Sequence, residues 1–461
     1  MNIAVILAAG EGTRMKSQIA KPLHKVCGKP MLQYIIDASI DANVEKHIVI
    51  VGHGGQEIKE YFQEGDLIFE EQAIGQGQPY GTGYAVMQAT EHIDDDSTVI
   101  ILFGDTPLIT ENTVNSLIQY HTSGGFDGTV LTAILEDAKG YGRIKRDKKG
   151  NISKIIEHKD ASEEEKNIKE INSGIFCFRG DLLKKALRKL DTSNTEGELY
   201  VTDIVEILNK EGYKLGACTI DDPTEIHGVN SKIQLSFSDK IMRQRINKYH
   251  MSKGITIIDP DSTYIESGVK IGRDTIIYPG VTIEDNTEIG DNCIIRGNTR
   301  IVNSEIKNNI TIESSLIEES IVESNTNIGP NAHLRPQSHI GKNVNIGNFV
   351  EVKKAYIGDH SKAGHLSYIG DATVGKNVNI GCGVVFVNYD GKKKHKTIIG
   401  DNAFVGSNCS LVAPVKINDW AYIAAGSTIT KEVEEGALSI GRSSQVNKED
   451  WVKEKGLMDT K

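Results

Sequence analysis

The pattern of apolar and polar positions divides the chain into two parts. Up to about residue 230, short runs rich in β-branched and aromatic residues alternate with stretches of helical periodicity. The β-type runs are Ile3–Leu7, Ile48–Val51, Leu67–Phe69, Val99–Phe103 and Gly174–Phe178. Strands that alternate with helices predict an α/β fold around a mostly parallel sheet.

The later part of the chain follows a period of six. From Ile265 to Ile301 an isoleucine recurs at every sixth residue. The residue four places after each of these isoleucines before Ile301, from Val269 to Thr299, is small or β-branched. After an interruption, apolar residues again recur at every sixth position over 328–352 and over 399–429. Neither a helix nor a simple strand repeats at six, whereas the coils of a β-helix do, each burying its apolar side against its neighbours. The insertion Asn388–Ile398 breaks the period, so we expect it to loop out, as binding segments of solenoids often do.

Between the two parts, residues 231–250 carry apolar residues at helical spacing together with paired charges. The segment contains neither glycine nor proline. It therefore predicts a connecting helix.

Composition excludes several classes of protein for this chain of 461 residues. With 38% hydrophobic and 25% charged residues it is typical of soluble globular proteins. The net charge of −11 gives no general attraction for nucleic acid or for an anionic membrane. The sequence also contains no run of about 18 apolar residues, which is the length that a bilayer span requires. The six cysteines lack metal-ligand or disulfide spacing, so we expect a reducing, cytoplasmic location.

The first candidate for chemistry is a glycine-rich turn directly after the first strand. Ile3–Leu7 is followed by Ala8-Ala9-Gly10-Glu11-Gly12-Thr13-Arg14, with Lys21-Pro22 a few residues later. Glycines after a strand allow a sharp turn whose backbone N–H groups face an anion. Arg14 and Lys21 would add positive charge, so the segment predicts a phosphate site.

The whole string L-A-A-G-x-G-T-R-M resembles that of the sugar-1-phosphate nucleotidylyltransferases. The six-residue repeats narrow the resemblance to the bifunctional N-acetylglucosamine-1-phosphate uridyltransferase/glucosamine-1-phosphate N-acetyltransferase family, over nearly the whole chain. Further segments that are similar to family motifs, in the family's order, are Gly81–Gly83, Phe103–Leu108, Gly140–Ile144, Ile156–Asp160, Glu170–Gly174 and Gly228–Asn230. The resemblance implies a Rossmann-like nucleotidyltransferase domain, a linker helix and a left-handed parallel β-helix.

For the first domain, the resemblance implies uridylyl transfer from UTP with Mg²⁺. A sugar-phosphate oxygen attacks the α-phosphorus in line and pyrophosphate leaves, with catalysis carried by charge from Arg14 and Lys21. Asp105 and Asn230 would be the Mg²⁺ ligands, because this ion prefers oxygen donors. The nucleotide and sugar residues would be Leu7, Ala8, Ala9, Gly10, Lys21, Gln72, Gly81, Thr82, Gly104, Asp105, Gly142, Glu157, Asn172 and Asn230.

One stretch departs from the family pattern. Where the family has a compact Q-x-x-Q-L-G-T-G-H-A, this chain is about four residues longer between Gln72 and Gly81, and Tyr84 replaces the usual histidine. Gln72 directly follows a predicted strand and is favoured as the reader of uracil. Gln76 is the alternative.

For the β-helix, the resemblance implies acetyl transfer from acetyl-CoA to glucosamine 1-phosphate. His365, within A-G-H-L-S-Y-I-G-D, would be the general base, since imidazole titrates near neutrality. The acetyl-acceptor residues would be Arg335, Lys353, Tyr368 and Asn379. The acetyl-CoA residues would be Cys382, Asn388, Tyr389, Ser407, Ala425 and Arg442, with Cys382 in place of an alanine common in the family.

The expected product of the two reactions is UDP-N-acetylglucosamine, a cell-envelope precursor. We predict domains at 1–229 and 251–461 with a linker helix at 230–250, and the family's trimers predict a homotrimer with acetyl sites between subunits. One alternative is a single-activity nucleotidylyltransferase whose β-helix only assembles subunits. Another is a non-enzymatic solenoid scaffold, which the presence of both sets of chemical residues argues against.

Overall fold

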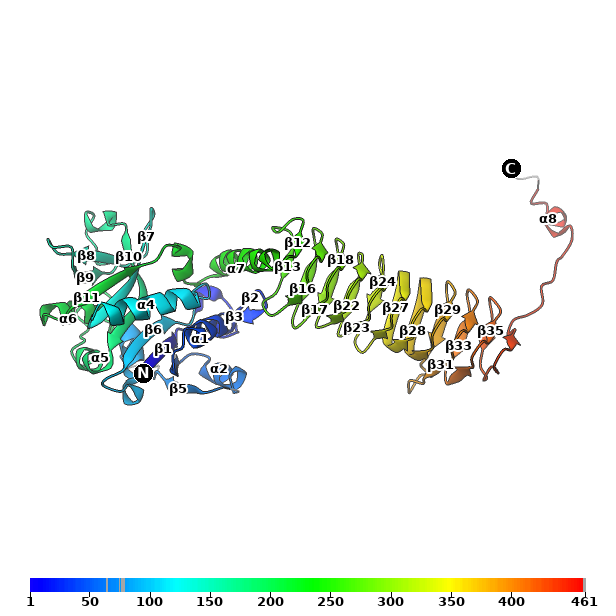
Figure 1. The fold of residues 1–461 in the computed structure, drawn as a ribbon, viewed down its shortest axis with the longest axis horizontal. Helices are drawn as coiled ribbons and strands as arrows, with labels where there is room; N and C mark the ends of the chain where they lie inside the picture. The colour runs from blue at the N-terminus through cyan, green and yellow to red at the C-terminus, as the bar shows by residue number, and fades with distance from the viewer. Residues whose placement is uncertain (64, 74, 76–78, 459–461) are drawn as a thin grey trace. The chain divides into compact units, whose positions relative to one another are not determined.

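The structure is a computed structural model that describes residues 1–63, 65–73, 75 and 79–458 (Figure 1). Its contacts divide the chain into two compact units, Met1–Met242 and Arg243–Lys461. Unit 1 has an α/β fold, and unit 2 is a parallel β-helix of short strands. The predicted order of an α/β domain, a helix and a hexapeptide β-helix is therefore confirmed.

A sheet of nine strands, within the described residues, forms the centre of unit 1. Its main path is β11-β7-β10-β6-β1-β4-β5, and β8 and β9 form a hairpin attached to β10. β1 pairs in parallel with β4 and β6, whereas β10 runs antiparallel to β6 and β7. The bounds are β1 (Asn2–Ala8), β4 (Lys46–Val51), β5 (Leu67–Glu71), β6 (Thr98–Phe103), β7 (Gly128–Ile134), β8 (Arg143–Arg146), β9 (Ile152–Ile156), β10 (Glu170–Arg179) and β11 (Leu215–Thr219).

Helices pack on both faces of this sheet (Figure 1). Alternate residues of β1 belong to two separate apolar clusters, with Ile6 in one and Val5 in the other. Burial on both faces explains why the strand is a continuous apolar run rather than an alternating one. The helices are α1 (Met31–Asp41), α2 (Gly55–Tyr61), α3 (Thr82–Met87), α4 (Glu111–Ser123), α5 (Gly180–Leu187) and α6 (Asp203–Lys210).

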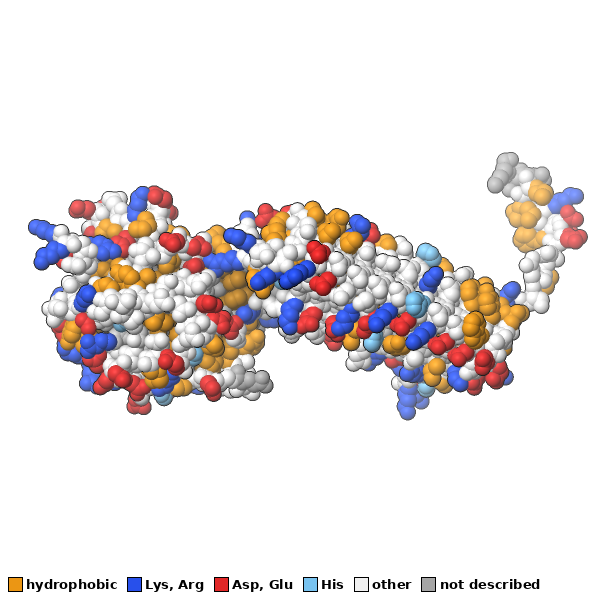
Figure 2. All heavy atoms as spheres, viewed as in Figure 1, with side chains coloured by type: hydrophobic (Ala, Val, Ile, Leu, Met, Phe, Trp, Pro, Cys, Tyr) orange, Lys and Arg blue, Asp and Glu red, His pale blue; other side chains and the backbone are white. Residues whose placement is uncertain are grey.

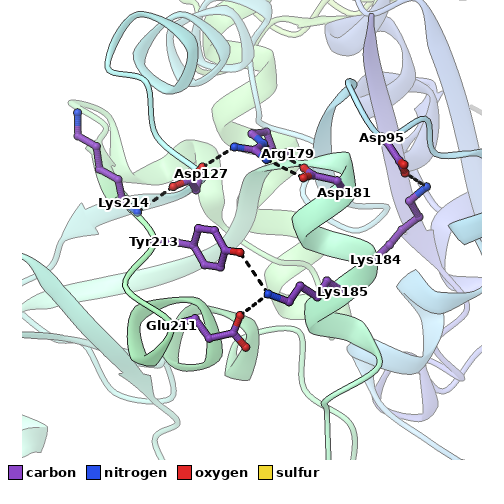
Figure 3. Close-up of polar contacts among 9 residues, drawn as sticks. All are labelled: Asp95, Asp127, Arg179, Asp181, Lys184, Lys185, Glu211, Tyr213 and Lys214. Carbon is purple, nitrogen blue, oxygen red and sulfur yellow. Dashed lines mark hydrogen bonds and ion pairs between the residues drawn. The ribbon is translucent and has the colours of Figure 1, made fainter.

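Ion pairs tie the outer edge of unit 1 together (Figure 3). Arg179, at the end of β10, bridges Asp127 at 3.0 Å and Asp181 at 2.6 Å. Lys185 on α5 lies 2.7 Å from Glu211, just after α6. The contacts join α5 and α6 to neighbouring strand ends, and they lie outside the cavities described below.

The predicted linker helix is α7 (Lys232–Ser252). In its first half, Asp239 accepts a 2.8 Å hydrogen bond from the backbone N–H of Cys27 in unit 1. In its second half, the Asn247 amide donates to the carbonyls of Pro260 and Thr263 in unit 2, at 2.8 and 3.0 Å. The contact boundary therefore falls inside the helix, because each half packs on its own unit.

The β-helix consists of strands β12 (Thr256–Ile257) to β37 (Leu438–Ser439), and most of these strands pair in parallel with the strand three places further along the chain. Tyr264 lies beside Thr282, and Thr282 beside Arg300, so a coil takes 18 residues, from 282 − 264 and 300 − 282. Three hexapeptides therefore make one coil. The isoleucines of the repeat form the core, with Ile277, Ile283 and Ile301 fully buried.

The corners of the coils are held by residues with left-handed backbones. Asparagines occupy many of these positions, as at Asn292 (φ 56°) and Asn402 (φ 59°), since asparagine tolerates this conformation better than most residues. Two longer strands, β27 (Asn345–Ile357) and β28 (Lys362–Val374), turn corners at Phe349 (φ 58°) and Leu366 (φ 40°). These two strands carry three of the predicted acetyl-transfer residues, Lys353, His365 and Tyr368.

Candidate functional sites

A cavity of about 350 Å³ lies in unit 1 at the carboxyl ends of β1 and β6. The turn after β1 shapes it. Gly12 has φ 63°, and a Cβ there would lie 2.8 Å from the Cβ of Lys21, so only glycine fits. The predicted residues on its wall are Leu7, Ala8, Ala9, Gly10, Arg14, Lys21, Gln72, Gly81, Thr82, Gly104, Asp105 and Asn230.

Lys21, Asp105 and Asn230 meet on this wall from distant parts of the sequence. The backbone N–H of Val229 donates to the carbonyl of Asp105 at 2.8 Å, which places Asn230 beside that carboxylate. The Lys21 ammonium donates to Asp105 Oδ2 and, at 2.7 Å, to Asn230 Oδ1. The donor set of one carboxylate and one amide oxygen fits Mg²⁺, which takes one or two oxygen ligands from a protein.

Three predicted sugar residues, Gly142, Glu157 and Asn172, do not line this cavity but lie close to one another. The Asn172 N–H donates to the Gly142 carbonyl at 2.9 Å, and Glu157 Oε1 lies 3.4 Å from where a Cβ on Gly142 would be. Glu157 lines a second cavity, of about 450 Å³, with Tyr200 and Asp203. Burial raises the pKa of the Glu157 carboxyl, against a hydrogen bond from Thr202 that lowers it.

The segment 198–202 joins the two cavities, and sequence reasoning missed it. Glu198 lines the first cavity and Tyr200 the second. Leu199 exchanges backbone bonds of 2.8 Å with Tyr80 and Gly83. Val201 N–H donates to Thr82 Oγ1 at 3.1 Å. In the sequence the segment alternates polar or aromatic residues with apolar ones, Glu198-Leu199-Tyr200-Val201-Thr202, and nothing in this pattern indicates which elements it would join.

Gln72, the predicted reader of uracil, lies at the wall of the first cavity. It lies directly after β5, its N–H donates to the carbonyl of Val51 at 2.8 Å, and its side chain is buried at the cavity wall. The alternative, Gln76, lies outside the described residues. Tyr80, from the longer segment before Gly81, also lines the cavity.

On the β-helix, four predicted residues repeat at one corner of successive coils. Ala363, Ile380, Val405 and Ile423 are in register across β28, β29 (Asn379–Ile380), β32 (Phe404–Val405) and β35 (Tyr422–Ile423). The residues two places after each are His365, Cys382, Ser407 and Ala425, all of them exposed. Within the described part of the chain, no side chain hydrogen-bonds the His365 imidazole.

The predicted acceptor residues occupy two adjoining faces of the coils. Asn379 lies on the face that precedes the corner, whereas Arg335, Lys353 and Tyr368 lie on the face that follows it. Arg335 Nη1 bonds Glu351 Oε1 at 2.8 Å, and this contact raises the pKa of Arg335. Two neighbouring cations lower the pKa of Lys353: the Lys394 ammonium has the larger effect and the Arg335 guanidinium the smaller one. Two cations of the second face, Arg335 and Lys353, thus lie near a third cation from the insertion, Lys394.

The insertion Asn388–Ile398 loops out as predicted, and its last two residues begin β31 (Thr397–Ile399). Figure 2 shows lysine side chains gathered on this projecting loop, whose sequence contains no arginine. At its base the buried Asn388 amide donates to Asp371 at 2.6 Å and to the Tyr368 hydroxyl at 3.3 Å. Tyr389 is 57% exposed, and Arg442 is exposed with its stem near Gly426 in the coil of Ala425.

Comparisons with known proteins cover both units. Residues 3–223 match the nucleotidyl transferase family, 263–303 and 396–431 match the bacterial transferase hexapeptide repeats, and 316–389 match the GMPPB C-terminal domain. The bifunctional protein GlmU of Alkaliphilus metalliredigens is 54% identical over 98% of both chains. Those of Clostridioides difficile and Acetivibrio thermocellus are 54% and 52% identical, over 99% of this chain and 98% of theirs.

The chain belongs to the GlmU family of bifunctional proteins. The prediction of an enzyme that combines a uridyltransferase with an N-acetyltransferase is therefore confirmed. The alternative of a single nucleotidylyltransferase activity is not favoured over this full-length similarity.

Two further findings concern membranes and metals. Among the residues that the structure describes, none of the helices combines the length and the apolar character that a bilayer span requires. In the same residues, no group of three or more His, Cys, Asp and Glu side chains is arranged to hold a metal ion. The pair of Asp105 and Asn230 is smaller than such a group and includes an amide.

Proposed function

We propose that the β-helix acetylates glucosamine 1-phosphate and that unit 1 then transfers UMP from UTP to the product, giving UDP-N-acetylglucosamine and pyrophosphate. The observation that carries this proposal is the convergence of Arg14, Lys21, Asp105 and Asn230 on one cavity of a chain whose β-helix presents His365. The two sets of residues belong to different compact units.

In unit 1, different sides of the cavity would bind the triphosphate and the uridine of UTP. The backbone of Leu7–Gly10, with Arg14 and Lys21, would hold the triphosphate, and Gln72, Gly81 and Thr82 would hold uridine. Asp105 and Asn230 would hold Mg²⁺, which supplies charge neutralisation at the reacting phosphates. Charge stabilisation by the two cationic side chains and the amides would carry most of the rate.

The sugar would extend from this cavity toward Gly142, Glu157 and Asn172. These residues carry backbone and side-chain groups suited to hydroxyl and amide recognition. Burial raises the pKa of the Glu157 carboxyl, which would accept hydrogen bonds from the sugar.

On the β-helix, His365 would take a proton from the acceptor amine as the nitrogen attacks the thioester of acetyl-CoA. Arg335 and Lys353 would bind the acceptor phosphate, with Tyr368 and Asn379 around the sugar. The corner residues Cys382, Ser407 and Ala425, with Asn388, Tyr389 and Arg442, would bind acetyl-CoA. The loop cation Lys394, which contacts Lys353, is a further candidate for phosphate binding.

We further propose a homotrimer with the acetyl sites between copies. Two observations support it. The predicted acceptor residues are divided between two adjoining faces of an exposed surface, and the exposed His365 imidazole has no hydrogen-bond partner within the described residues of one copy. The six free thiols fit a reducing compartment, and we propose a cytoplasmic location.

The test supplies the full chain with glucosamine 1-phosphate, acetyl-CoA, UTP and Mg²⁺, and follows free thiol and pyrophosphate separately. We expect thiol release first, and pyrophosphate release only after acetylation. Pyrophosphate from N-acetylglucosamine 1-phosphate without any thiol release from the amine would leave only the uridyltransferase. Thiol release without pyrophosphate would show that the longer segment before Gly81 has disabled the first site.

A further inference from the structure

The ammonium group of Lys21 contacts two side-chain oxygens at the wall of the first cavity. Lys21 Nζ donates to Asp105 Oδ2 and to Asn230 Oδ1, the latter at 2.7 Å. The side chains of Lys21 and Asp105 are only 13% and 20% exposed. The ammonium therefore lies between the two oxygens that the proposed function assigns to Mg²⁺, in a position shielded from bulk water.

A lysine that served only to bind phosphate would not need this position. Arg14 lines the same cavity, yet no ion pair joins it to Asp105, so the carboxylate is paired specifically with Lys21. Gly12 packs directly against the Lys21 stem, where even a methyl group would collide, and thereby holds the side chain close to the oxygens. The arrangement satisfies a partly buried carboxylate that would otherwise carry an uncompensated charge.

The ammonium and a divalent cation exclude each other at this place. The Asn230 side chain offers one oxygen, and that oxygen already accepts from Lys21. Bringing Mg²⁺ within coordination distance of both oxygens would put it a few ångströms from the ammonium, where like charges repel strongly because the groups are partly buried. One cation must therefore leave before the other binds.

We propose that Lys21 is an exchangeable counter-cation: its ammonium neutralises Asp105 and Asn230 until Mg²⁺ displaces it, and it then turns to the phosphates of the nucleotide. This inference rests on the proposed metal role of Asp105 and Asn230. Its consequence is that Mg²⁺ alone binds weakly, whereas a nucleotide that offers the ammonium an alternative partner makes the two oxygens available. Metal and nucleotide binding are thereby coupled through one side chain.

The experiment measures Mn²⁺ binding to the nucleotide-free full chain from the electron paramagnetic resonance signal of free Mn²⁺, an ion that also prefers oxygen ligands. Lys21→Met removes the charge and keeps most of the stem. Lys21→Arg keeps the charge. Lys29→Met is the matched control, because Lys29 is also paired with a carboxylate of unit 1, Asp37, at 2.7 Å. Circular dichroism checks that every variant is folded.

We expect Lys21→Met to bind Mn²⁺ about tenfold more tightly than the unmodified chain, because the competing cation is gone. Lys21→Arg and Lys29→Met should stay within about twofold, and adding Asp105→Ala to Lys21→Met should abolish the gain. Unchanged or weaker binding by Lys21→Met overturns the exchange, as does a gain that survives Asp105→Ala. If Mn²⁺ binds in an Asp105-dependent manner but equally to Lys21→Met and the unmodified chain, the metal role stands and only the exchange fails.

A second measurement observes Lys21 in the unmodified chain and needs a variant only for assignment. Biosynthetic incorporation of 6-¹³C-lysine labels the lysines of the full chain without changing their ammonium groups, and the Lys21 resonance is assigned from its loss in Lys21→Arg. We expect Mg²⁺ without nucleotide to shift this resonance at concentrations that leave the Lys29 resonance unchanged. A Lys21 resonance that stays fixed while metal occupies the Asp105 site would overturn the exchange.

Discussion

The two candidate sites are built in opposite ways. In unit 1, loops that are far apart in sequence converge on one enclosed cavity, so Lys21, Asp105 and Asn230 meet although more than 200 residues separate the first from the last. On the β-helix, residues are placed by repetition, and His365, Cys382 and Ser407 occupy the same corner of successive coils. Convergence encloses a ligand within one copy, whereas repetition exposes a row of groups along an open surface.

The two sites differ in whether one copy of the chain supplies all the walls around the substrate. The cavity of unit 1 already has walls, a cation and metal-type oxygens within one chain. The corner of the β-helix has none of the enclosure that proton transfer and oxyanion stabilisation require. A second copy of the chain is the simplest wall for such a surface, and the predictions below test this contrast.

The largest effects should come from single changes at the two centres. His365→Ala should lower thiol release by about 10²- to 10⁴-fold, because the proposed general base is lost, and leave pyrophosphate release from N-acetylglucosamine 1-phosphate unchanged. Asp105→Ala should do the reverse, since it removes a proposed metal ligand. Separate assays of thiol and pyrophosphate measure both. Loss of both activities in either folded variant would contradict two independent sites.

The next largest effect is expected when two β-helix variants, each inactive alone, are combined in one assembly. Arg335→Ala and Asn379→Ala change different faces of the same β-helix. If each acetyl site combines one face from each of two copies, mixed assemblies of the two variants contain sites with both residues intact. In a trimer that contains both variants, one of the three sites then has both residues intact, so about a third of the normal thiol release is expected.

The measurement uses co-expressed variants with different affinity tags, purified through both tags. Mixed assemblies that are no more active than either variant alone would mean that one copy supplies both residues. As a control from unit 1, Arg14→Ala mixed with Asp105→Ala should regain no pyrophosphate release, because both residues line a cavity within one copy.

The sequence predicted most of the fold because the two periods are governed by burial. A repeat of six specifies inward positions directly, and Ile277, Thr287 and Cys293 are buried as their register requires. The short strands β8 and β9 were not predicted, since a hairpin with one exposed side has no distinctive apolar run. The reversed direction of β10 was also beyond reach, because strand direction depends on connections rather than composition.

For the sites, motifs identified the residues, whereas only coordinates could group them. The cavity brings Gln72 together with Asp105, while Glu157 lies on a neighbouring cavity. The role of segment 198–202 depends on backbone hydrogen bonds to Tyr80 and Gly83, and such bonds are not specific to side-chain type. The contact between Lys353 and Lys394 needs the conformation of the insertion, which has no repeat to fix its register.

Core truncations should damage one activity at a time. Ile301 in the β-helix and Ile101 in the sheet of unit 1 are both fully buried. Replacing either by alanine should destabilise its own unit by about 2–5 kcal/mol, the usual cost of a buried cavity. Ile301→Ala should thus lower the temperature at which thiol release is lost, and Ile101→Ala that for pyrophosphate release. Equal loss of both activities in both variants would show that the units unfold together.

A pH-dependent effect is expected at Asp203. Burial, with repulsion from Asp191 and Glu157, raises its pKa from 3.8 to about 6. The folded state then holds this proton more tightly than the unfolded state, so stability falls as pH rises from about 4 to 6 and stays lower above 6. Asp203→Asn should therefore stabilise unit 1 at pH 7.5 by about 1 kcal/mol, after allowance for solvent screening, and have little effect at pH 4.

Urea denaturation followed by circular dichroism at both pH values checks this expectation. The exposed Asp96 provides the matched control, and Asp96→Asn should leave the midpoint unchanged at either pH. Equal effects of Asp203→Asn at pH 4 and pH 7.5 would rule out ionisation as the cause.

The smallest effect is expected for the ion pairs at the outer edge of unit 1 (Figure 3). Arg179 is 49% exposed and pairs with Asp127 and Asp181. Solvent screens such pairs, so Arg179→Ala should cost less than about 1 kcal/mol and lower neither activity. The urea midpoint in low and high salt is the measurement, with most of the difference from the unmodified chain disappearing at 1 M salt. A large loss that persists in salt would mean that packing of the Arg179 stem, rather than its charge, joins α5 to the sheet.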